Sequence, residues 1–248
     1  MGRGPNRREV ILAQLGTRNR VDVTELTRLF GVSEMTVRRD LAELQHEGLL
    51  RRVHGGAVRL DRSPFEIRDE QLPAEKTRIA KKAAALIDDG DTVAIDIGTT
   101  AHYVARELRH RTGLLIITNS IKIAAEFRNT PNKVLVPGGM MLPELSLVGP
   151  ITTEALRRLH AAKAILGCGG LTLTHGLSYF DINETEVRRT MIDISDESIV
   201  VADHTKFGRT ETVSLGPPDM VDVIITDREP AGEFRPVFAD GDVELIVA

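Results

Sequence analysis

The chain has 248 residues, of which 42% are hydrophobic and 27% charged, which suits one large domain or two ordinary ones and excludes a disordered chain. Its apolar runs are far shorter than the roughly 18 residues of a membrane span, and no signal-peptide stretch follows the basic N-terminus. The single cysteine, Cys168, excludes an internal disulfide and a cysteine-based zinc site, and the seven histidines show no metal-ligand spacing. We therefore expect a soluble, cytoplasmic protein with no metal, no cofactor and no membrane partner.

The charge is divided unevenly along the chain. Residues 1–60 carry a net charge of +4, and all the basic residues among them are arginines. The remaining 188 residues carry a net charge of −8. A mildly basic head on an acidic body suits a head that binds a polyanion. A chance fluctuation explains +4 as well, so charge alone decides nothing.

Two short helices joined by a tight turn are predicted near the N-terminus. Asp22 and Glu25 form a capping box that opens the first helix, and Gly31 ends it. Ser33 then caps a second helix over 34–46, whose apolar side chains recur at helical spacing. This order of elements is the helix-turn-helix pattern.

A hairpin completes the predicted DNA-binding head. Residues 49–60 alternate around Gly55-Gly56, which predicts a two-stranded wing with a Gly-Gly turn. In helix-turn-helix proteins the second helix enters the major groove with its first turns nearest the bases. The DNA-binding residues we expect are Ser33, Glu34, Met35, Thr36, Arg38 and Arg39 on the second helix and Arg51, Arg52 and His54 on the wing. A solvated arginine face on a capped helix pair is the alternative, but pair, wing and charge together favour double-stranded DNA.

These residues also resemble a known signature. The pattern is Val23-x-Glu25-Leu26, then Phe30-Gly31-Val32-Ser33-x-x-Thr36-Val37-Arg38-Arg39-Asp40-Leu41, then Gly48-Leu49-Leu50-x-Arg52-Val53-His54-Gly55-Gly56-Ala57. It is similar to the N-terminal signature of the DeoR family of bacterial transcription regulators. The resemblance implies a winged helix-turn-helix domain and an effector-sensing C-terminal domain, most often in a repressor of sugar-metabolism genes.

The rest of the chain reads as a linker and an α/β body. Residues 61–75 are polar and contain two prolines, so we expect domains at 1–60 and 76–248 with a linker between them. Strands are expected at 92–97, 114–118, 133–136, 164–168, 198–202, 221–226 and 243–247, and helices at 76–87, 100–109, 120–128, 152–160 and 184–194. This alternation predicts a mainly parallel sheet covered on both faces, in an order that the sequence does not reveal.

Polar residues and glycines follow several of these strands, where an open α/β sheet binds its ligand. Gly98, Thr99 and Thr100 lead into a helix whose free amides suit a phosphate, and Lys206 supplies a point charge. The effector-binding residues we expect are Asp96, Gly98, Thr99, Thr100, Thr118, Asn119, Ser120, Gly138, Gly139, Gly169, Gly170, Asp181, Glu184 and Lys206. Each also fits a helix cap, a turn, a tight loop or a surface lysine. The joint interpretation requires that the loops share one edge of the sheet.

The body resembles the same family. The motifs are Asp96-x-Gly98-Thr99-Thr100, Thr118-Asn119-Ser120, Gly138-Gly139, Ser146-x-x-Gly149-Pro150, Asp181-x-x-Glu184, Arg188-x-x-Met191-Ile192 and Ala202-Asp203-x-x-Lys206-Phe207-Gly208. The resemblance implies a fold related to ribose-5-phosphate isomerase and glucosamine-6-phosphate deaminase. It also implies a phosphorylated sugar as effector and DNA binding as a homo-oligomer, a dimer or a tetramer.

That relationship raises the rival hypothesis of a sugar-phosphate isomerase. Isomerisation needs a carboxylate base, and the loop that resembles the isomerase's Asp-Gly-Ala-Asp-Glu segment is here Gly167-Cys168-Gly169-Gly170-Leu171, without a carboxylate. Many DeoR relatives also have an Asp in this loop, so the chain departs from its own family there. Glu184 and Glu186 remain possible bases, but we expect no enzyme. A third hypothesis gives the body only an oligomerisation role.

Overall fold

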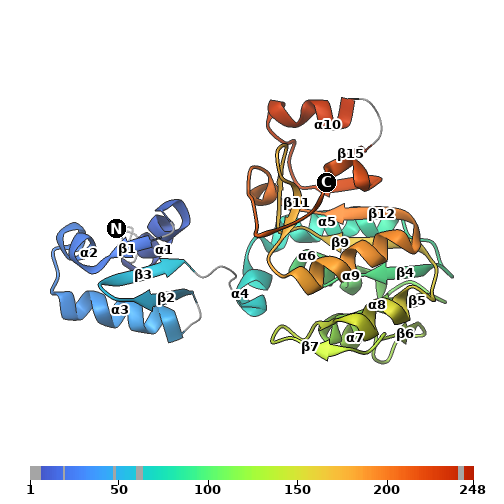
Figure 1. Cartoon of the computed structure of the whole chain (residues 1–248), viewed down its shortest axis with the longest axis horizontal. Coiled ribbons are helices and arrows are strands. Elements are labelled where there is room, and N and C mark those ends of the chain that lie inside the picture. The colour runs from blue at the N-terminus through green and yellow to red at the C-terminus, as the bar shows by residue number, and fades with distance from the viewer. Residues whose placement is uncertain (1–6, 19, 47–48, 60–63, 240–242) are drawn as a thin grey trace. The chain divides into compact units, whose positions relative to one another are not determined.

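The computed structural model describes residues 7–18, 20–46, 49–59, 64–239 and 243–248. It divides into two compact units, Met1–Arg68 and Asp69–Ala248 (Figure 1). Residues 61–63 of the expected linker lie outside the described residues. The rest of that segment differs from the expectation, because helix α4 (Phe65–Glu70) crosses it and helix α5 (Pro73–Ala85) begins in it. Phe65 is buried, and Pro73 stands in the first turn of α5, where a missing N–H costs nothing.

The first unit holds three helices and a small sheet. Its elements are α1 (Arg7–Arg18), β1 (Arg20–Asp22), α2 (Val23–Phe30), α3 (Glu34–His46), β2 (Leu50–Val53) and β3 (Gly56–Arg59). The Asp22 side chain accepts the N–H of Thr24, and α2 ends at Gly31 in the left-handed region with φ 64°. The predicted helix pair is therefore confirmed. Glu25 does not complete the capping box, since its carboxylate lies 3.8 Å from the guanidinium of Arg18.

The wing turns one residue earlier than predicted. Val53 pairs with Gly56, so the turn is His54-Gly55, and Gly55 takes φ 79°. The cause is the unpredicted strand β1, which pairs with β3 so closely that a Cβ on Gly56 would overlap the carbonyl oxygen of Val21. Gly56 is thus required for sheet packing and not for the turn.

The second unit is built on a seven-stranded parallel sheet. Its strands are β4 (Thr92–Ile95), β5 (Leu115–Thr118), β6 (Lys133–Leu135), β9 (Ala161–Gly167), β12 (Ser195–Val201), β14 (Val223–Thr226) and β15 (Glu244–Val247). Their order is β15-β14-β12-β9-β4-β5-β6, and every pairing is parallel. The seven predicted strands and the parallel α/β fold are confirmed. Because all the strands run the same way, their carboxyl ends share one edge.

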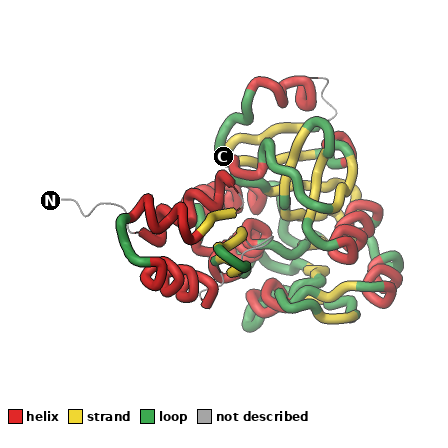
Figure 2. The backbone as a smooth tube through the Cα atoms, turned by 60° about the vertical axis from the view of Figure 1, so that its left-hand side comes forward, coloured by secondary structure: helices red, strands yellow, loops and turns green. Residues whose placement is uncertain are grey.

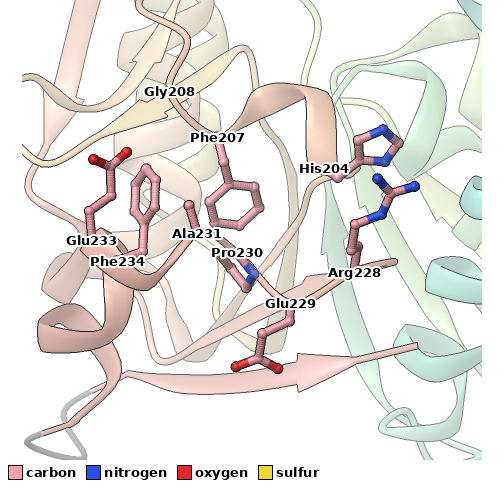
Figure 3. Close-up of a pocket in the computed structure, with 9 residues that line it drawn as sticks. All are labelled: His204, Phe207, Gly208, Arg228, Glu229, Pro230, Ala231, Glu233 and Phe234. Carbon is pink, nitrogen blue, oxygen red and sulfur yellow. The ribbon is translucent and has the colours of Figure 1, made fainter.

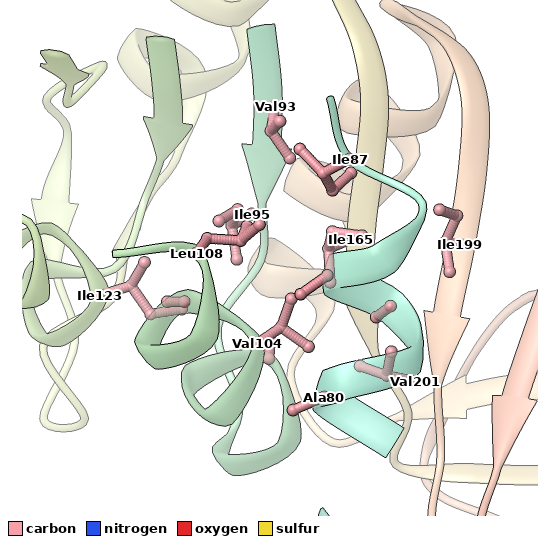
Figure 4. Close-up of a cluster of buried hydrophobic side chains, with 14 of the residues drawn as sticks. Ala80, Ile87, Val93, Ile95, Val104, Leu108, Ile123, Ile165, Ile199 and Val201 are labelled. Carbon is pink, nitrogen blue, oxygen red and sulfur yellow. The ribbon is translucent and has the colours of Figure 1, made fainter. Parts of the chain in front are cut away.

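Helices cover both faces of this sheet, as the red helices on either side of the yellow strands indicate (Figure 2). Alternate residues of each strand point to opposite faces. Val93 and Ile95 join a cluster with α5, α6 (Thr99–Leu108) and α7 (Ile121–Glu126), drawn in Figure 4. Ala94 joins the cluster on the other face, with α8 (Pro150–Leu156) and α9 (Ile182–Asp193).

Several short elements were not predicted. They are β7 (Met140–Met141) paired with β8 (Leu147–Val148), the sheet of β10 (Gly170–Thr172), β11 (Gly176–Tyr179) and β13 (Val213–Gly216), and helix α10 (Arg235–Ala239). The antiparallel sheet β10-β11-β13 follows directly from the end of β9. It brings the Tyr179 hydroxyl to the carbonyl of Gly167, to which it donates a hydrogen bond of 2.8 Å.

The order of strands reverses between β4 and β9. From β4 the chain continues to β5 and β6 on one side, and β9, β12, β14 and β15 follow on the other. Ligands of open α/β sheets bind outside the carboxyl ends of the strands at such a switch point. Here that point lies between the segments that follow Ile95 and Gly167.

Candidate functional site

Helix α3 presents an exposed basic face. Val37, Leu41 and Leu44 are buried in the core of the first unit, whereas Met35 is 75% exposed and the Arg39 side chain is 81% exposed. The apolar positions fix which side of α3 is free, so Met35, Arg38 and Arg39 lie together on its outer side.

The arginines on this face are held only by weak pairs. Nη2 of Arg38 lies 3.4 Å from Oε2 of Glu34, and Nε of Arg39 lies 3.1 Å from Oε1 of Glu43. Exposed pairs of this spacing are worth about 0.3–0.5 kcal/mol, whereas a bidentate arginine–guanine contact gives about 1–3 kcal/mol of discrimination. DNA can therefore replace either carboxylate as partner.

The start of α3 and the wing are fixed by local hydrogen bonds. Ser33 Oγ accepts the N–H of Thr36 at 3.3 Å and lies 2.9 Å from the Thr36 hydroxyl. Ser33 therefore caps α3 as predicted, and its hydroxyl also engages the hydroxyl of Thr36, although both side chains were expected to contact DNA. The N–H of Arg52 donates to Gln45 Oε1 at 2.8 Å, which ties β2 to α3. Arg51, Arg52 and His54 are all exposed along the edge strand and its turn.

In the second unit, the ends of β4 and β9 meet closely at the switch point. Asp96 is fully buried, and its Oδ2 accepts the N–H of Gly167 at 3.3 Å. A Cβ on Gly98 would lie 3.9 Å from the Gly167 Cα. The structure thus brings the predicted residues Asp96 and Gly98 against the loop that follows β9.

Arg188, on α9, is the residue that our sequence reasoning missed. It is 3% exposed, and its Nε donates to Asp96 Oδ2 at 2.7 Å. Its Nη2 lies 3.8 Å from Glu184 Oε2, and its guanidinium lies 4.2 Å from the centre of the Tyr179 ring. The i,i+4 spacing of Glu184 and Arg188 was a signal of their contact, but not of their burial beside Asp96.

The same network reaches the loop after β5. The Ser146 hydroxyl donates to Glu184 Oε1 at 2.9 Å, and Ser146 forms a β-bridge with Ser120. Asn119 Nδ2 donates to the carbonyl of Leu147 at 3.1 Å. The Thr118 hydroxyl donates to the carbonyl of Ile95 at 2.6 Å, which closes the network back to β4. Five predicted residues, Asp96, Thr118, Asn119, Ser120 and Glu184, are therefore brought together.

Burial and charge shift two pKa values in this network. Burial, only partly offset by Arg188, raises the pKa of Asp96 to about 6. Burial alone would lower the pKa of Arg188, but the carboxylates of Asp96 and Glu184 outweigh it and raise that pKa. The guanidinium is therefore charged, and Asp96 titrates near neutral pH.

Cys168 lies among several charged side chains at the end of β9. Burial raises the pKa of its thiol to about 12, opposed by the positive charges of Lys206, Arg188 and Arg209. Lys206 follows β12, the parallel neighbour of β9, and its Nζ lies 3.9 Å from Asp203 Oδ2. The thiol stays protonated, as expected of a packing residue.

The N-terminus of α6 differs from those of α7 and α9. Ser120 caps α7 by accepting the N–H of Ile123, and Asp181 caps α9 by accepting from Asn183 and Glu184. Helix α6 starts after Gly98 with no side-chain cap and no acidic residue in its first turn. Its free amides and the partial positive charge of the helix dipole favour an anion. The capping of α9 accounts for Asp181 at this position without a ligand.

The paired glycines are explained by the chain's own packing. A Cβ on Gly139 would overlap the Thr152 hydroxyl, and one on Gly170 would overlap the carbonyl of Arg209. A Cβ on Gly169 would lie 2.6 Å from the carbonyl of Ser178. Gly138 takes φ 79° in the loop that accepts a hydrogen bond from Thr152. Ligand approach is not needed to account for these four residues.

One cavity of about 230 Å³ lies farther along the same edge (Figure 3). It is lined by His204, Phe207, Gly208, Arg228, Glu229, Pro230, Ala231, Glu233 and Phe234. The His204 ring lies beside the Arg228 guanidinium, and its Nδ1 is 2.8 Å from Asp227 Oδ2. None of the fourteen predicted effector residues lines this cavity, although Lys206 lies between two that do.

Helix α6 connects the switch point with the start of the second unit. Tyr103 donates from its hydroxyl to the carbonyl of Asp69 at 3.2 Å, and Arg106 Nη2 lies 3.4 Å from Asp69 Oδ2. His102 Nδ1 lies 3.5 Å from Asp69 Oδ1, and His102 Nε2 lies 2.9 Å from Glu126 Oε1. One helix therefore carries the free amides at Gly98 and, one turn later, the contacts to Asp69.

Two negative findings apply to the residues that the structure describes. None of the helices there has the length and apolar character to cross a bilayer. No group of three or more His, Cys, Asp or Glu side chains among those residues is arranged to hold a metal ion.

Family models match both units. Residues 7–63 match the model of the DeoR-like helix-turn-helix domain, and residues 71–228 match that of the DeoR C terminal sensor domain. Among relatives, the HTH-type transcriptional repressor CsqR of Escherichia coli is 34% identical over 98% of this chain and 95% of its own length. The glycerol-3-phosphate regulon repressor of E. coli is 34% identical over 91% of each chain. The regulator IolR of Bacillus subtilis is 34% identical over 84% of this chain and 85% of its own.

Solved structures give a weaker likeness. Ribose 5-phosphate isomerase A of Methanocaldococcus jannaschii is 19% identical, covers 53% of each chain and has a TM-score of 0.40. The corresponding enzyme of Plasmodium falciparum is 17% identical, with a TM-score of 0.40 over 54% of this chain and 52% of its own.

Proposed function

The chain belongs to the DeoR family of helix-turn-helix transcriptional regulators, and we propose that it is a repressor released from its operator by a phosphorylated sugar. In this proposal α3 reads the major groove and the β2-β3 wing follows the backbone. The effector binds at the switch point between β4 and β9. A regulator that occupies an operator works beside the bacterial chromosome, so we infer that it acts in the cytoplasm.

The exposed face of α3 supports the DNA half of the proposal. Arg38 and Arg39 are exposed beside Met35, and each gives up only a weak ion pair on binding DNA. Paired half-sites on DNA call for two copies of such a head, so we propose that the protein acts as a dimer or a tetramer.

The observation that carries the effector half is the uncapped start of α6 at the switch point. Its free amides follow Gly98, and Lys206 directly precedes Phe207, which forms a β-bridge with Leu171 in the segment after β9. Amides, a helix dipole and the ammonium of Lys206 suit a phosphoryl group without a metal. One relative is named for a phosphorylated three-carbon polyol, the glycerol-3-phosphate regulon repressor, which favours a ligand of this class.

Helix α6 supplies a route from effector to head. Its first turn lies at the proposed phosphate site, and the next turn holds Asp69, which directly follows the first unit. A phosphate that pulls on the α6 amides would move the anchor of the chain that leads into the head. An effector shifts DNA affinity only by binding the two states unequally, and this contact offers the means.

Catalysis is the less supported alternative. The loop after β9 has no carboxylate, and the buried carboxylates Asp96 and Glu184 are engaged by Arg188 and Ser146. The relatives of this chain are named as transcription regulators.

A panel of phosphorylated sugars and their unphosphorylated counterparts tests the proposal. We expect at least one phosphorylated sugar to raise the melting temperature and release the protein from operator DNA, whereas its unphosphorylated form does neither. Lys206→Ala should abolish release while leaving operator affinity unchanged. The matched control is Lys163→Ala, which should respond as wild type. Lys163 lies near the start of β9, and its Nζ pairs with Glu197 Oε2 at 2.7 Å. Release that persists in Lys206→Ala would remove this lysine from the site.

A further inference from the structure

Three buried polar atoms at the switch point have no hydrogen-bond partner among the described residues. They are Asp96 Oδ1, Asn119 Oδ1 and Arg188 Nη1. Asp96 and Asn119 are fully buried and Arg188 is 3% exposed. A buried polar group without a partner destabilises the fold, and more so when it is charged. Three in one network indicate that something absent from the chain itself completes them.

The three side chains are held rigidly by their other atoms. Asp96 Oδ2 accepts from Arg188 Nε at 2.7 Å and from the N–H of Gly167. Asn119 Nδ2 donates to the carbonyl of Leu147, and the guanidinium of Arg188 is packed on the Tyr179 ring. Each residue is therefore fixed in orientation by the chain and leaves one atom for a ligand, as a preorganised site requires.

Asp96 and Asn119 also stand at equivalent positions on adjacent strands. Ile95 and Thr118 are register partners in the parallel pair β4-β5. Asp96 directly follows Ile95, and Asn119 directly follows Thr118. Neighbouring strands lie about 4.8 Å apart, and side chains at matching positions point to the same face. For Asp96 that is the face of Ala94, which α9 covers and from which Arg188 enters. The two acceptors thus lie on one face, one strand apart.

The chemistry of the three atoms selects a hydroxyl-rich ligand. A carboxylate oxygen and an amide oxygen accept hydrogen bonds, and a guanidinium nitrogen donates one. A phosphoryl group only accepts, so it would leave Asp96 and Asn119 unsatisfied. A hydroxyl both donates and accepts. Two hydroxyls on neighbouring carbons can donate to the two oxygens while one of them accepts from Arg188.

We propose that Asp96, Asn119 and Arg188 form the subsite that recognises neighbouring hydroxyl groups of the effector, with Arg188 as the residue that determines specificity. This inference rests on the proposed function and divides its site in two. The α6 amides and Lys206 bind the phosphoryl end, and the buried triad of Asp96, Asn119 and Arg188 binds the polyol part. The effector class is a phosphorylated polyhydroxy compound and not a small phosphorylated acid.

Ligand pairs that differ by one hydroxyl test the subsite in the full-length protein. Suitable probes are glucose 6-phosphate with 2-deoxyglucose 6-phosphate, ribose 5-phosphate with 2-deoxyribose 5-phosphate, glycerol 3-phosphate, and inorganic phosphate. By calorimetry, we expect wild type to bind one hydroxylated member 10- to 100-fold more tightly than its deoxy partner. The deoxy ligand leaves one of these buried polar atoms without a partner, which accounts for a loss of that size.

Arg188→Lys keeps the positive charge beside Asp96 and Glu184 but changes the donor geometry. We expect it to lower the discrimination to less than threefold and to leave binding of inorganic phosphate within twofold. Arg189→Lys, on the next residue of α9 with a 42% exposed side chain, is the matched control and should discriminate as wild type. Should Arg188→Lys fail to fold, the isosteric Asp96→Asn replaces it, since an amide nitrogen at Oδ1 turns the acceptor into a donor and should lose the same discrimination.

The outcomes separate the two proposals. Discrimination that survives in a folded Arg188→Lys or Asp96→Asn protein overturns the subsite. Binding of every phosphorylated probe without regard to hydroxyls also overturns the subsite and leaves the proposed function standing. If no phosphorylated probe binds wild type, the proposed effector class is wrong. In that case the unphosphorylated polyol ribitol is the further probe: binding that Arg188→Lys weakens would support the hydroxyl subsite, and no binding would overturn it.

Discussion

Arg39 is the residue on which the DNA-binding hypothesis can be tested most simply. Its side chain is 81% exposed and pairs only across one helical turn with Glu43, so its loss should not disturb the fold. We expect Arg39→Ala to weaken operator binding ten- to hundred-fold at physiological salt, as measured by fluorescence anisotropy, since a base contact is worth about 1–3 kcal/mol. Effector affinity should not change.

The matched control for this change is Arg157→Ala in the second unit. Arg157 is 53% exposed and pairs with Glu154 one turn away. It is thus an exposed arginine with a similar ion pair, but it does not lie on α3. It should leave operator affinity within twofold. Equal operator affinity for wild type and Arg39→Ala would place this side chain outside the groove.

Asp96 gives the protein a specific pH dependence. Its pKa of about 6 in the folded protein exceeds the ordinary 3.8, so the folded state binds a proton that the unfolded state releases between these values. The stability that Asp96 contributes is complete below about pH 4 and is lost as the pH rises through 6, a change of about 3 kcal/mol. Between pH 4 and pH 7, the free energy of unfolding of wild type, measured with denaturant, should fall by that amount relative to that of Asp96→Asn. A difference between the two proteins that stays constant over this range would contradict the assignment.

Residues at strand ends were predictable, and residues that reach them from elsewhere were not. Asp96, Asn119 and Glu184 were found because they follow strands or stand in a local motif. Arg188 was missed as a site residue because its burial beside Asp96 depends on how α9 packs on the sheet, which no short-range pattern encodes. Gly169 and Gly170 were interpreted as positions of ligand approach, but the neighbouring strand β11 and the chain at Arg209 and Glu211 come equally close to them.

At the level of elements, periodicity sufficed for long segments and failed for short ones. Helix α3 was predicted with its observed bounds because Val37, Leu41 and Leu44 mark its buried side. The strand β1 was missed because three residues carry no detectable alternation and pair only through the tertiary fold. That strand also moved the wing turn to His54-Gly55.

Gly56 tests this explanation of the wing. In Gly56→Ala the new methyl group would overlap the Val21 carbonyl, so β1 and β3 must separate, at a cost of about 1–3 kcal/mol. Both tyrosines, Tyr103 and Tyr179, lie in the second unit and the chain has no tryptophan, so hydrogen exchange by mass spectrometry must report on the first unit. Peptides covering 20–22 and 56–59 should exchange faster.

Gly31→Ala is the control for a glycine needed only for its backbone conformation. No atom lies within 4 Å of its added Cβ, but its φ of 64° is strained for alanine, at a cost of about 1 kcal/mol. Protection of β1 and β3 should therefore fall less than in Gly56→Ala. Equal protection in wild type and Gly56→Ala would disprove the close approach of β1.

At the level of the whole molecule, sequence predicted two domains and their charges but not how one affects the other. The basic residues 1–60 and the acidic remainder were visible in composition. The helices α4 and α5, which occupy much of the expected linker, were not visible in composition. Asp69, in α4, is fixed by Tyr103 and Arg106 of α6, a helix distant in sequence.

Asp69→Asn tests whether that contact carries the regulatory signal. Loss of the carboxylate charge weakens the contacts to Arg106 and His102 while leaving the phosphate site at Gly98 intact. We expect effector affinity to stay within twofold and the effector's weakening of operator binding to fall at least fivefold. Asp89→Asn, a loop carboxylate that accepts the N–H of Thr112, is the control and should behave as wild type. Undiminished release in Asp69→Asn would show that α6 is not the route.

The most direct measurement of the central claim is the affinity of the protein for its phosphorylated sugar, taken free and bound to operator DNA. Linkage requires that the factor by which operator weakens effector binding equals the factor by which effector weakens operator binding. We predict the same factor in both titrations, about 5- to 150-fold, with the effector binding the free protein more tightly. Equal effector affinity for free and operator-bound protein would contradict the account.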